Sequence, residues 1–398
     1  MNYKKRTLPI FLICYFAYTA IYIARVNLSM AAPELRELQI LTESQYGVLG
    51  SLFSIIYATG RLLIGSLSDK KPPVLLICSG LCLCAISNIL IGFVTPFIGI
   101  LILWCTNALA QSMLWSSVLC VISSIYEETI AKKRTTIMVT AVATGNILGI
   151  LLPVYLIETF GIHMAFIAPG ILTLIAAACV FFAIRKIPSP SENVKQPQKN
   201  LFQLIKNPNL RIALVPTFFH GVIKDNVTLW MTVYFIDRYS VNLSQSAYSV
   251  LLIPVVGLIG RLLYPFVYQL CKNKEHTVSK IAFIGCLFAA LLLCSNFIPL
   301  IIAMLCLSLV YTAVSMANTS FLSIYPMSFA SSGNVASVSG IMDFCTYLGA
   351  GVASVIYGVV IENWGYLPMF ISWAILSVAA LFFLKKLESK TSDNTIHT

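Results

Sequence analysis

Long runs of apolar residues alternate with short polar connections along the whole chain of 398 residues. Each run is about 20 residues long, the length at which an α-helix crosses roughly 30 Å of bilayer hydrocarbon. The pattern therefore predicts an all-α integral membrane protein with twelve transmembrane helices. These helices are expected at residues 8–32, 46–68, 74–95, 98–125, 136–159, 163–184, 210–236, 245–270, 280–297, 299–325, 336–361 and 366–384.

The balance of charged and apolar residues excludes a water-soluble protein. Hydrophobic residues make up 58% of the chain and charged residues 10%, whereas a soluble domain carries roughly 25% charged residues. The net charge is +11, but most of the 26 Lys and Arg residues lie at the two ends or in the even-numbered connections between helices. These positions share one face of a twelve-helix protein, which is the positive-inside bias.

This bias indicates the orientation of the chain and argues against a nucleic-acid partner. We expect a multi-pass protein of the cell membrane (plasma or inner membrane) with both termini in the cytoplasm. Residues 185–209 form the longest polar connection and have the Pro, Ser, Asn and Gln content of a linker. They predict an N-terminal six-helix bundle at 1–184, a cytoplasmic linker, a C-terminal six-helix bundle at 210–386 and a cytoplasmic tail at 387–398.

The two halves repeat short sequences at an offset of about two hundred residues. Residues 41–49 match residues 243–251, and Ile-Glu-Thr-Phe-Gly at 157–161 matches Ile-Glu-Asn-Trp-Gly at 361–365. Because each half contains six predicted helices, the two repeats have the same orientation in the membrane. The sequence therefore predicts two parallel six-helix repeats.

Four cationic residues lie inside predicted helices and follow the same repeat. Arg25 pairs with Lys224, and Arg61 pairs with Arg261 in an identical Gly-Arg-Leu-Leu string. A charge at the bilayer centre costs at least about 2.5–3.5 kcal/mol. Four such residues in symmetric positions indicate a central cavity that holds an anion.

Three segments resemble a known family. Residues 65–71 resemble the Gly-x-x-x-Asp-basic signature of major facilitator transporters, although Pro72-Pro73 stand where Gly-Arg commonly follows. Residues 22–33 resemble the first helix of the organophosphate:phosphate antiporters (the glycerol-phosphate and hexose-phosphate type). They resemble the anion:cation symporters (the sialin and hexuronate type) about equally well. Residues 224–235 favour the antiporters, because they are similar to the Arg-(Asp)-Gly-x-x-x-Trp-x-Pro-x-Tyr pattern of the seventh helix.

The resemblance implies a major facilitator fold, with the substrate near the membrane midplane between halves that rock around it. It implies that Arg25 binds the anionic group of the substrate, a role that suits the planar guanidinium fork. Lys224 stands where the family has a second arginine, and a lysine leaves room for a carboxylated substrate. Arg61 stands at the position of a cavity lysine, with snorkelling or a gate ion pair as the alternative. The family's histidine on the fifth helix is replaced by Gly145, and neither His163 nor His220 is an obvious substitute.

Three further charged residues have open roles. Asp343 could carry a proton in symport or serve as the fixed counter-charge of Arg261 or Lys224. Asp225 follows Lys224 directly, and adjacent residues of a helix do not face each other, so we expect it to pair with another cation. Arg261 is interpreted as a gating or structural residue.

The candidate site residues fall into two groups. Substrate contacts are expected from Arg25, Lys224, Arg61, Tyr22, Trp230, Asn27, Asn226 and Gln111. Gating at the cytoplasmic side is expected from Gly65, Asp69 and Lys70.

The leading interpretation is a secondary active transporter that moves a small organic anion, a phosphorylated metabolite or a carboxylate, by alternating access. Inorganic phosphate or a proton is the expected coupling ion. The protein is expected to lie in the lipid bilayer as a monomer. The alternatives are a proton-coupled carboxylate or hexuronate symporter and a transporter-like membrane sensor of organic phosphate; a channel is a more distant one.

An enzyme is not expected. No P-loop and no Ser/His/Asp arrangement is present, so no catalytic residue is proposed. The twelve cysteines lack the spacing of a metal site. No cofactor or metal is therefore expected.

Overall fold

The computed structural model of the chain describes residues 7–68, 71–184, 204–272, 274–295, 297–332 and 335–396. Every regular element in this part of the chain is helical. In chain order the elements are α1 (Thr7–Glu37), α2 (Glu43–Ser68), α3 (Pro73–Ile91), α4 (Phe97–Ser112), α5 (Leu114–Ile125), α6 (Glu128–Phe160), α7 (Met164–Ile184), α9 (Pro208–Tyr239), α10 (Leu243–Leu270), α11 (Glu275–Leu293), α12 (Leu300–Thr319), the π-helix η2 (Ser320–Ile324), the 3₁₀-helix η3 (Tyr325–Ser332), α13 (Val335–Trp364) and α14 (Leu367–Ile396).

Eleven helices of the described residues are long and apolar enough to cross a membrane. The helices α4 and α5 together form one of these spans, from Phe97 to Ile122. The predicted span that is not among these eleven is the seventh, at residues 210–236. It corresponds to α9, which has 32 residues but includes the polar residues His220, Lys224, Asp225 and Asn226. The predicted all-α membrane class is confirmed, and the least apolar of the twelve predicted spans is the one that carries the candidate chemistry of the second half.

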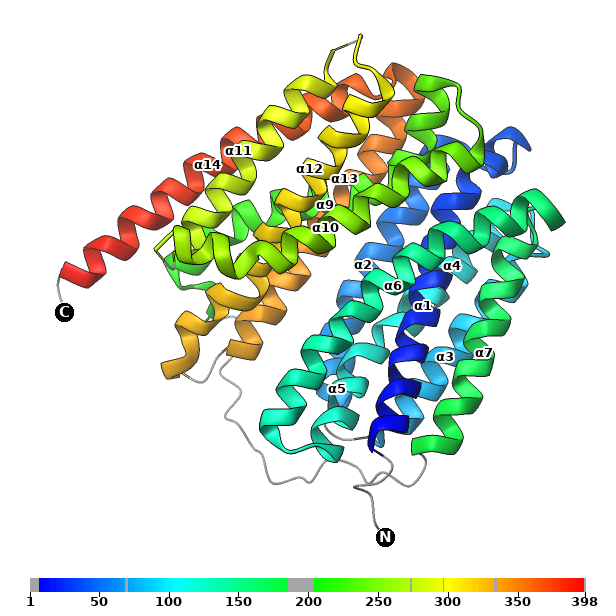
Figure 1. The fold of residues 1–398 in the computed structure, drawn as a ribbon, viewed down its shortest axis with the longest axis horizontal. Helices are drawn as coiled ribbons and strands as arrows, with labels where there is room; N and C mark the ends of the chain where they lie inside the picture. The colour runs from blue at the N-terminus through cyan, green and yellow to red at the C-terminus, as the bar shows by residue number, and fades with distance from the viewer. Residues whose placement is uncertain are drawn as a thin grey trace. The chain divides into compact units, whose positions relative to one another are not determined.

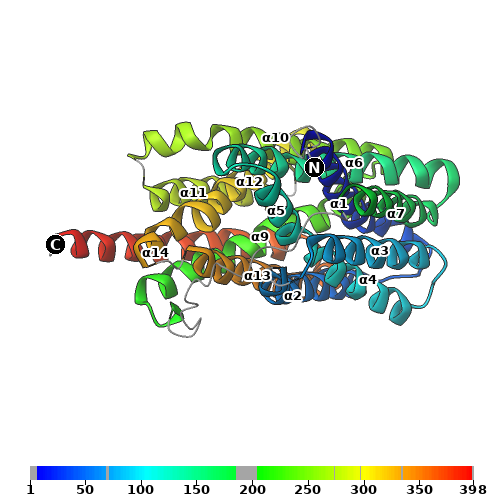
Figure 2. The same ribbon diagram turned by 90° about the horizontal axis from the view of Figure 1, so that it is seen from below.

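The chain divides into two compact units (Figures 1 and 2). Unit 1 consists of Met1–Lys195 with Val241–Tyr248, and unit 2 consists of Gln196–Ser240 with Ser249–Thr398. The first residues of α10 therefore belong to unit 1. The predicted bundles at 1–184 and 210–386 were continuous and did not include this exchange.

The sequence repeat has a structural counterpart at the ends of helices. Both α6 and α13 end at a glycine with positive φ, 87° at Gly161 and 71° at Gly365. In each case the glycine amide donates a hydrogen bond of 2.9 Å to the isoleucine carbonyl four residues earlier. Glycine tolerates this backbone conformation without a steric penalty, which is why it ends both helices.

The starts of α2 and α10 also match, but in a different register from the sequence alignment. Thr42 and Gln45 exchange side-chain and backbone hydrogen bonds in a capping box, and so do Asn242 and Gln245. The matching capping boxes make Thr42 equivalent to Asn242. The alignment of 41–49 with 243–251 is shifted by two residues from this equivalence. The structural offset agrees with that of the cationic pairs.

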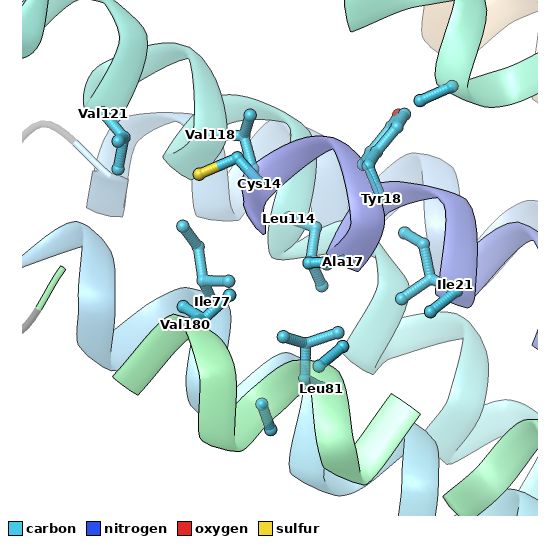
Figure 3. Close-up of a cluster of buried hydrophobic side chains, with 14 of the residues drawn as sticks. Cys14, Ala17, Tyr18, Ile21, Ile77, Leu81, Leu114, Val118, Val121 and Val180 are labelled. Atoms are coloured by element: carbon cyan, nitrogen blue, oxygen red, sulfur yellow. The ribbon is translucent and has the colours of Figure 1, made fainter. Parts of the chain in front are cut away.

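In unit 1, α1 packs against α6 and α7, and α3 packs against α7 and α4 (Figures 1 and 2). Side chains of α1, α3, α5 and α7 form an apolar cluster that includes Ala17, Leu81, Leu114 and Val180 (Figure 3). On the other side of α1, a Cβ atom added at Gly145 of α6 would overlap Tyr22 and lie 2.8 Å from the Thr19 carbonyl oxygen. No side chain fits at Gly145 unless α1 and α6 move apart.

In unit 2, α9 packs against α12, α13 and α14. The contact with α13 is a backbone contact, because a Cβ atom at Gly221 would overlap the carbonyl of Thr346. Glycine is unfavourable in a helix interior by roughly 0.5–1 kcal/mol relative to alanine. Its presence at Gly221 is explained by the close approach of the two helices.

We expect Gly221→Ala to lower the melting temperature of the purified protein, because its Cβ meets backbone atoms that cannot rotate away. Gly285→Ala is the matched control, because the nearest atom to its added Cβ is that of Ala313 at 3.8 Å. The control should leave the melting temperature unchanged or raise it slightly through helix propensity. Differential scanning fluorimetry in detergent measures both, and equal melting temperatures for the two variants would contradict the packing.

Candidate anion-binding residues in the two units

The guanidinium group of Arg25 lies among aromatic rings in unit 1. Its Cζ atom is 4.7 Å from the ring centre of Tyr57, 4.8 Å from that of Phe53 and 5.6 Å from that of Tyr22. The face of an aromatic ring attracts a cation, and this attraction increases when the cation is desolvated. The rings therefore stabilise a half-buried arginine while its N–H donors point along the plane of the guanidinium group.

Arg61 shares one of these rings. It follows Tyr57 by one turn of α2, and its Cζ atom is 5.7 Å from the Tyr57 ring centre. Arg25 of α1 and Arg61 of α2 therefore both lie beside Tyr57, and both are half-buried. Two guanidinium groups that share a ring form a region of positive charge suited to an oxyanion.

A buried network of amides fixes the helix that carries Arg25. Asn27 is two residues further along α1, about 200° around the helix axis, so it lies on the opposite side from Arg25. Its amide donates to Asn88 Oδ1 at 2.9 Å and to the Ala165 carbonyl at 3.0 Å. The Asn88 amide in turn donates to Asn107 Oδ1 at 3.3 Å. The network joins α1 to α3, α4 and α7.

Two amides of α4 bind the backbone next to Arg25. Asn107 donates to the carbonyl of Ala24 at 3.1 Å, and Gln111 donates to the same carbonyl at 3.4 Å and to Asn107 Oδ1 at 3.2 Å. Gln111 is 1% exposed and Asn107 is 0% exposed. They restrain the rotation of α1 at the residue that precedes the arginine.

Lys224 of unit 2 pairs with its neighbour in sequence. Its Nζ atom is 3.3 Å from Asp225 Oδ1 and 5.2 Å from the ring centre of Tyr347 on α13. The expectation that Asp225 would pair with another cation is not met by this ion pair, because the flexible lysine stem lets the ammonium group fold back to the adjacent carboxylate. The other oxygen, Asp225 Oδ2, is buried and accepts no hydrogen bond from the described residues.

An asparagine anchors α9 in the same way as α1. Asn226, two residues after Lys224, donates to the Val222 carbonyl at 2.8 Å and to the Ala350 carbonyl of α13 at 3.5 Å. Its Oδ1 atom accepts from Trp230 Nε1 and from Ser354 Oγ, both at 3.2 Å. Asn226 and Trp230 are fully buried. In both units, therefore, the asparagine two residues after the cation is buried and joins its helix to other helices by hydrogen bonds.

The remaining candidates have less defined surroundings. Arg261 on α10 and Asp343 on α13 are half-buried, and their roles stay predictions. Gly65 lies in α2, while Asp69 and Lys70 fall outside the described residues. No group of three His, Cys, Asp or Glu residues within the described ranges could hold a metal ion.

Sequence reasoning missed three aromatic residues of the two sites. Phe53 and Tyr57 precede Arg61 at intervals of four residues, so the three side chains lie along one face of α2. That spacing is a signal that could have identified them. Tyr347 had no such signal, because it reaches Lys224 from a helix far along the chain.

Comparison with known proteins identifies the family of the chain. Residues 14–354 match the model of the Major Facilitator Superfamily. The chain belongs to this superfamily. Its members are transporters, so the expectation of transport rather than catalysis is confirmed, as is the resemblance to the organophosphate:phosphate antiporter type.

Two relatives are similar over nearly their whole length. The glycerol-3-phosphate transporter of Bacillus subtilis (strain 168) is 26% identical over 95% of this chain and 92% of that protein. The probable hexose phosphate transport protein of Chlamydia muridarum (strain MoPn / Nigg) is 23% identical over 96% of this chain and 91% of that protein. A shorter match, 32% identical over 28% of this chain and 25% of the relative, is to the membrane sensor protein UhpC of Escherichia coli (strain K12).

Solved structures of superfamily transporters share the fold. The nucleoside transporter NupG superimposes with a TM-score of 0.76 at 13% identity, covering 96% of this chain and 98% of that chain. A bacterial homolog of the human lysosomal transporter Spinster, in an inward-facing and unoccupied conformation, gives a TM-score of 0.71 at 16% identity, covering 95% and 94%.

We expect Asn226→Ala to lower the melting temperature, because it leaves the Trp230 indole N–H buried without its acceptor, at about 1–3 kcal/mol. Trp230→Phe removes that N–H, so the double variant should be less destabilised than the sum of the single variants. Asn363→Ala is the control, since its exposed amide donates only to the Val359 carbonyl of its own helix. If the losses of stability caused by Asn226→Ala and Trp230→Phe simply add in the double variant, the hydrogen bond between the two residues does not stabilise the protein.

Proposed function

We propose that this chain is a secondary active transporter that moves a small phosphorylated metabolite across the membrane by alternating access. The observation that carries the proposal is the pair Arg25 and Arg61, which lie beside the same Tyr57 ring in unit 1. Lys224 of unit 2, at the repeat-related position to Arg25, supplies a further cation during the cycle. The names of the full-length relatives, glycerol-3-phosphate and hexose phosphate transporters, support a phosphate group over a carboxylate.

The charges suit a phosphate group. A guanidinium group donates two parallel hydrogen bonds to a phosphate, and such charge-assisted bonds are worth about 1.5–3 kcal/mol each. Lys224 adds a compact charge without a fork, and an anion that reaches it must compete with Asp225. A carboxylated substrate remains the alternative, because a carboxylate satisfies the same donors with less charge.

Further features of the proposal come from the charge pattern and the repeat. Both termini and the 185–209 linker lie in the cytoplasm, the protein is a monomer of the cell membrane, and the two six-helix halves move relative to each other during transport. Inorganic phosphate is the proposed counter-substrate, which makes the transporter an antiporter. Tyr22, Trp230, Asn27, Asn226 and Gln111 are proposed to hold the cations in place, with Tyr22 at the anion itself.

A membrane sensor is the second candidate, favoured by the partial match to UhpC. A sensor binds the anion but does not exchange it. Proteoliposomes loaded with inorganic phosphate separate the two functions, because only a transporter releases labelled phosphate when phosphate or glycerol 3-phosphate is added outside. Binding without exchange would replace the transporter by the sensor.

We expect Arg25→Ala to reduce phosphate exchange at least about tenfold, the loss that corresponds to about 1.4 kcal/mol of binding free energy. Arg25→Lys should fall in between, since it keeps the charge and loses the fork. The matched control is Arg134→Lys, because Arg134 also lies over two aromatic rings, those of Phe11 and Tyr126, outside the proposed site. Equal exchange by Arg25→Ala and the wild type would overturn the site.

A further inference from the structure

Three hydroxyl groups meet where α1 packs against α6 in unit 1. The Tyr15 hydroxyl lies 3.1 Å from Thr140 Oγ1 and 2.9 Å from Thr144 Oγ1. Thr140 is exposed, while Tyr15 and Thr144 are half-buried. All three residues belong to helices long and apolar enough to cross a membrane, where polar side chains are costly and often mark a substrate pathway. We name Tyr15, Thr140 and Thr144 the hydroxyl cluster of unit 1.

The hydroxyl cluster lies on the side of α1 that carries Arg25. Tyr22 precedes Arg25 by three residues, and Tyr18 precedes Tyr22 by four. Tyr15 lies a further three residues before Tyr18, so the four side chains share one face of the helix. The ring centres of Tyr18 and Tyr22 are 5.4 Å apart, and that of Tyr22 is 5.6 Å from the Arg25 Cζ atom. The cluster therefore continues the row of aromatic residues that begins beside the arginine.

The hydroxyl cluster is also close to the anion site along α6. Thr144 directly precedes Gly145, where an added Cβ atom would lie 2.4 Å from the Cβ of Tyr22. Thr140 is one turn further from this contact, about 6 Å along the helix axis. Since the Tyr22 ring lies beside Arg25, a phosphate group bound at Arg25 leaves the cluster within reach of the carbon chain attached to it.

The hydrogen bonds within the cluster leave it short of donors. Thr140 donates to the Ile137 carbonyl at 2.7 Å, and Thr144 donates to the Thr140 carbonyl at 3.2 Å. The two contacts of Tyr15 with the threonines bring the total to four contacts, but three hydroxyl groups supply only three protons. The cluster therefore has acceptor oxygens to spare and one proton too few.

A cluster that is rich in acceptors selects a ligand by the donors of that ligand. A hydroxyl group of the ligand brings a proton and donates it to a hydroxyl oxygen of the cluster. An ionised carboxylate or phosphate has only acceptors, so it forms hydrogen bonds here only if the threonines give up their backbone carbonyls. A site that accepts a hydrogen bond from a substrate hydroxyl discriminates strongly against an analogue without that hydroxyl.

We propose that the hydroxyl cluster of unit 1 binds a hydroxyl group on the carbon chain of the substrate while Arg25 binds its phosphate group. The inference rests on the proposed transport function and narrows the substrate to a phosphorylated metabolite with hydroxyl groups at its uncharged end. Tyr15, Thr140 and Thr144 are then specificity-determining residues. A metabolite that ends in a carboxylate or a second phosphate group is disfavoured at the same place.

Exchange of two counter-substrates tests the hydroxyl cluster. Proteoliposomes are loaded with labelled phosphate, and unlabelled phosphate, which has no carbon chain, or glycerol 3-phosphate is added outside. We expect Tyr15→Phe and, separately, Thr144→Val to raise the KM for glycerol 3-phosphate about three- to tenfold, the effect of one lost hydrogen bond. The KM for phosphate should stay unchanged. The matched control is Thr159→Val on the same helix, because Thr159 is exposed and donates to the Tyr155 carbonyl of its own helix.

A counter-substrate with a carboxylate tests the selectivity. In 3-phosphoglycerate a carboxylate replaces the terminal hydroxyl of glycerol 3-phosphate. The wild type should prefer glycerol 3-phosphate, and Tyr15→Phe should reduce this preference. If Tyr15→Phe raises the KM for phosphate and for glycerol 3-phosphate equally, the hydroxyl has a structural role, and if it changes neither, the hydroxyl makes no contact with the substrate. Each of these results overturns the proposal.

A binding measurement separates this inference from the proposed transport. If the wild type exchanges no phosphate, the transporter is refuted, and thermal-shift titration of the purified protein still compares the two ligands. The dissociation constant for glycerol 3-phosphate should then be higher in Tyr15→Phe than in the wild type, while that for phosphate stays the same. Exchange with equal KM values in Tyr15→Phe and the wild type refutes the role of the hydroxyl cluster and leaves the transporter intact.

Discussion

A permanent charge inside a membrane helix is stable only if its surroundings replace the water that it lost, and the two units meet this requirement differently. In unit 1 the guanidinium of Arg25 lies among the rings of Tyr22, Phe53 and Tyr57. In unit 2 the ammonium of Lys224 lies beside the Asp225 carboxylate and the Tyr347 ring. Aromatic faces bring no negative charge to an arginine, whereas a carboxylate competes with any incoming anion. Unit 1 is therefore better suited to hold a phosphate group, and anion binding in unit 2 must involve a rearrangement of Asp225.

The orientation of both cations depends on buried asparagines two residues further along each helix. Asn27 and Asn226 are fully buried, and each ties its helix to the interior of its own unit through hydrogen bonds to other helices. Since two residues span about 200° of an α-helix, an asparagine that faces the interior places the cation on the other side. The two halves thus share the position of the asparagine relative to the cation, which sets the rotation of the helix about its axis. The cation itself and the groups that stabilise its charge differ between the halves.

Much of this could be predicted from the sequence, because a bilayer imposes helix length and hydropathy on any chain that crosses it. The twelve predicted spans follow from that constraint, and eleven helices of the described residues meet it by length and hydropathy. The twelve include α9, which was predicted as a span although its charges lower its hydropathy. The partners were less accessible. Asp225 was predicted to pair with a cation other than Lys224, because adjacent residues of a helix do not face each other. That argument does not limit a long lysine side chain. Tyr347 lies too far from Lys224 in the sequence for any local pattern to identify it. Phe53 and Tyr57 could have been found from their spacing to Arg61 on α2.

The glycine at the position of the family's histidine and the aromatic rings around Arg25 belong to one packing arrangement. Gly145 allows α6 to approach α1 so closely that it touches the Cβ of Tyr22 and the backbone at Thr19. That approach limits where Tyr22 can lie, and its ring is one of the three beside Arg25. A histidine at Gly145 would push the helices apart and move a wall of the Arg25 site. Retaining the aromatic surroundings of Arg25 therefore excludes an imidazole on this part of α6.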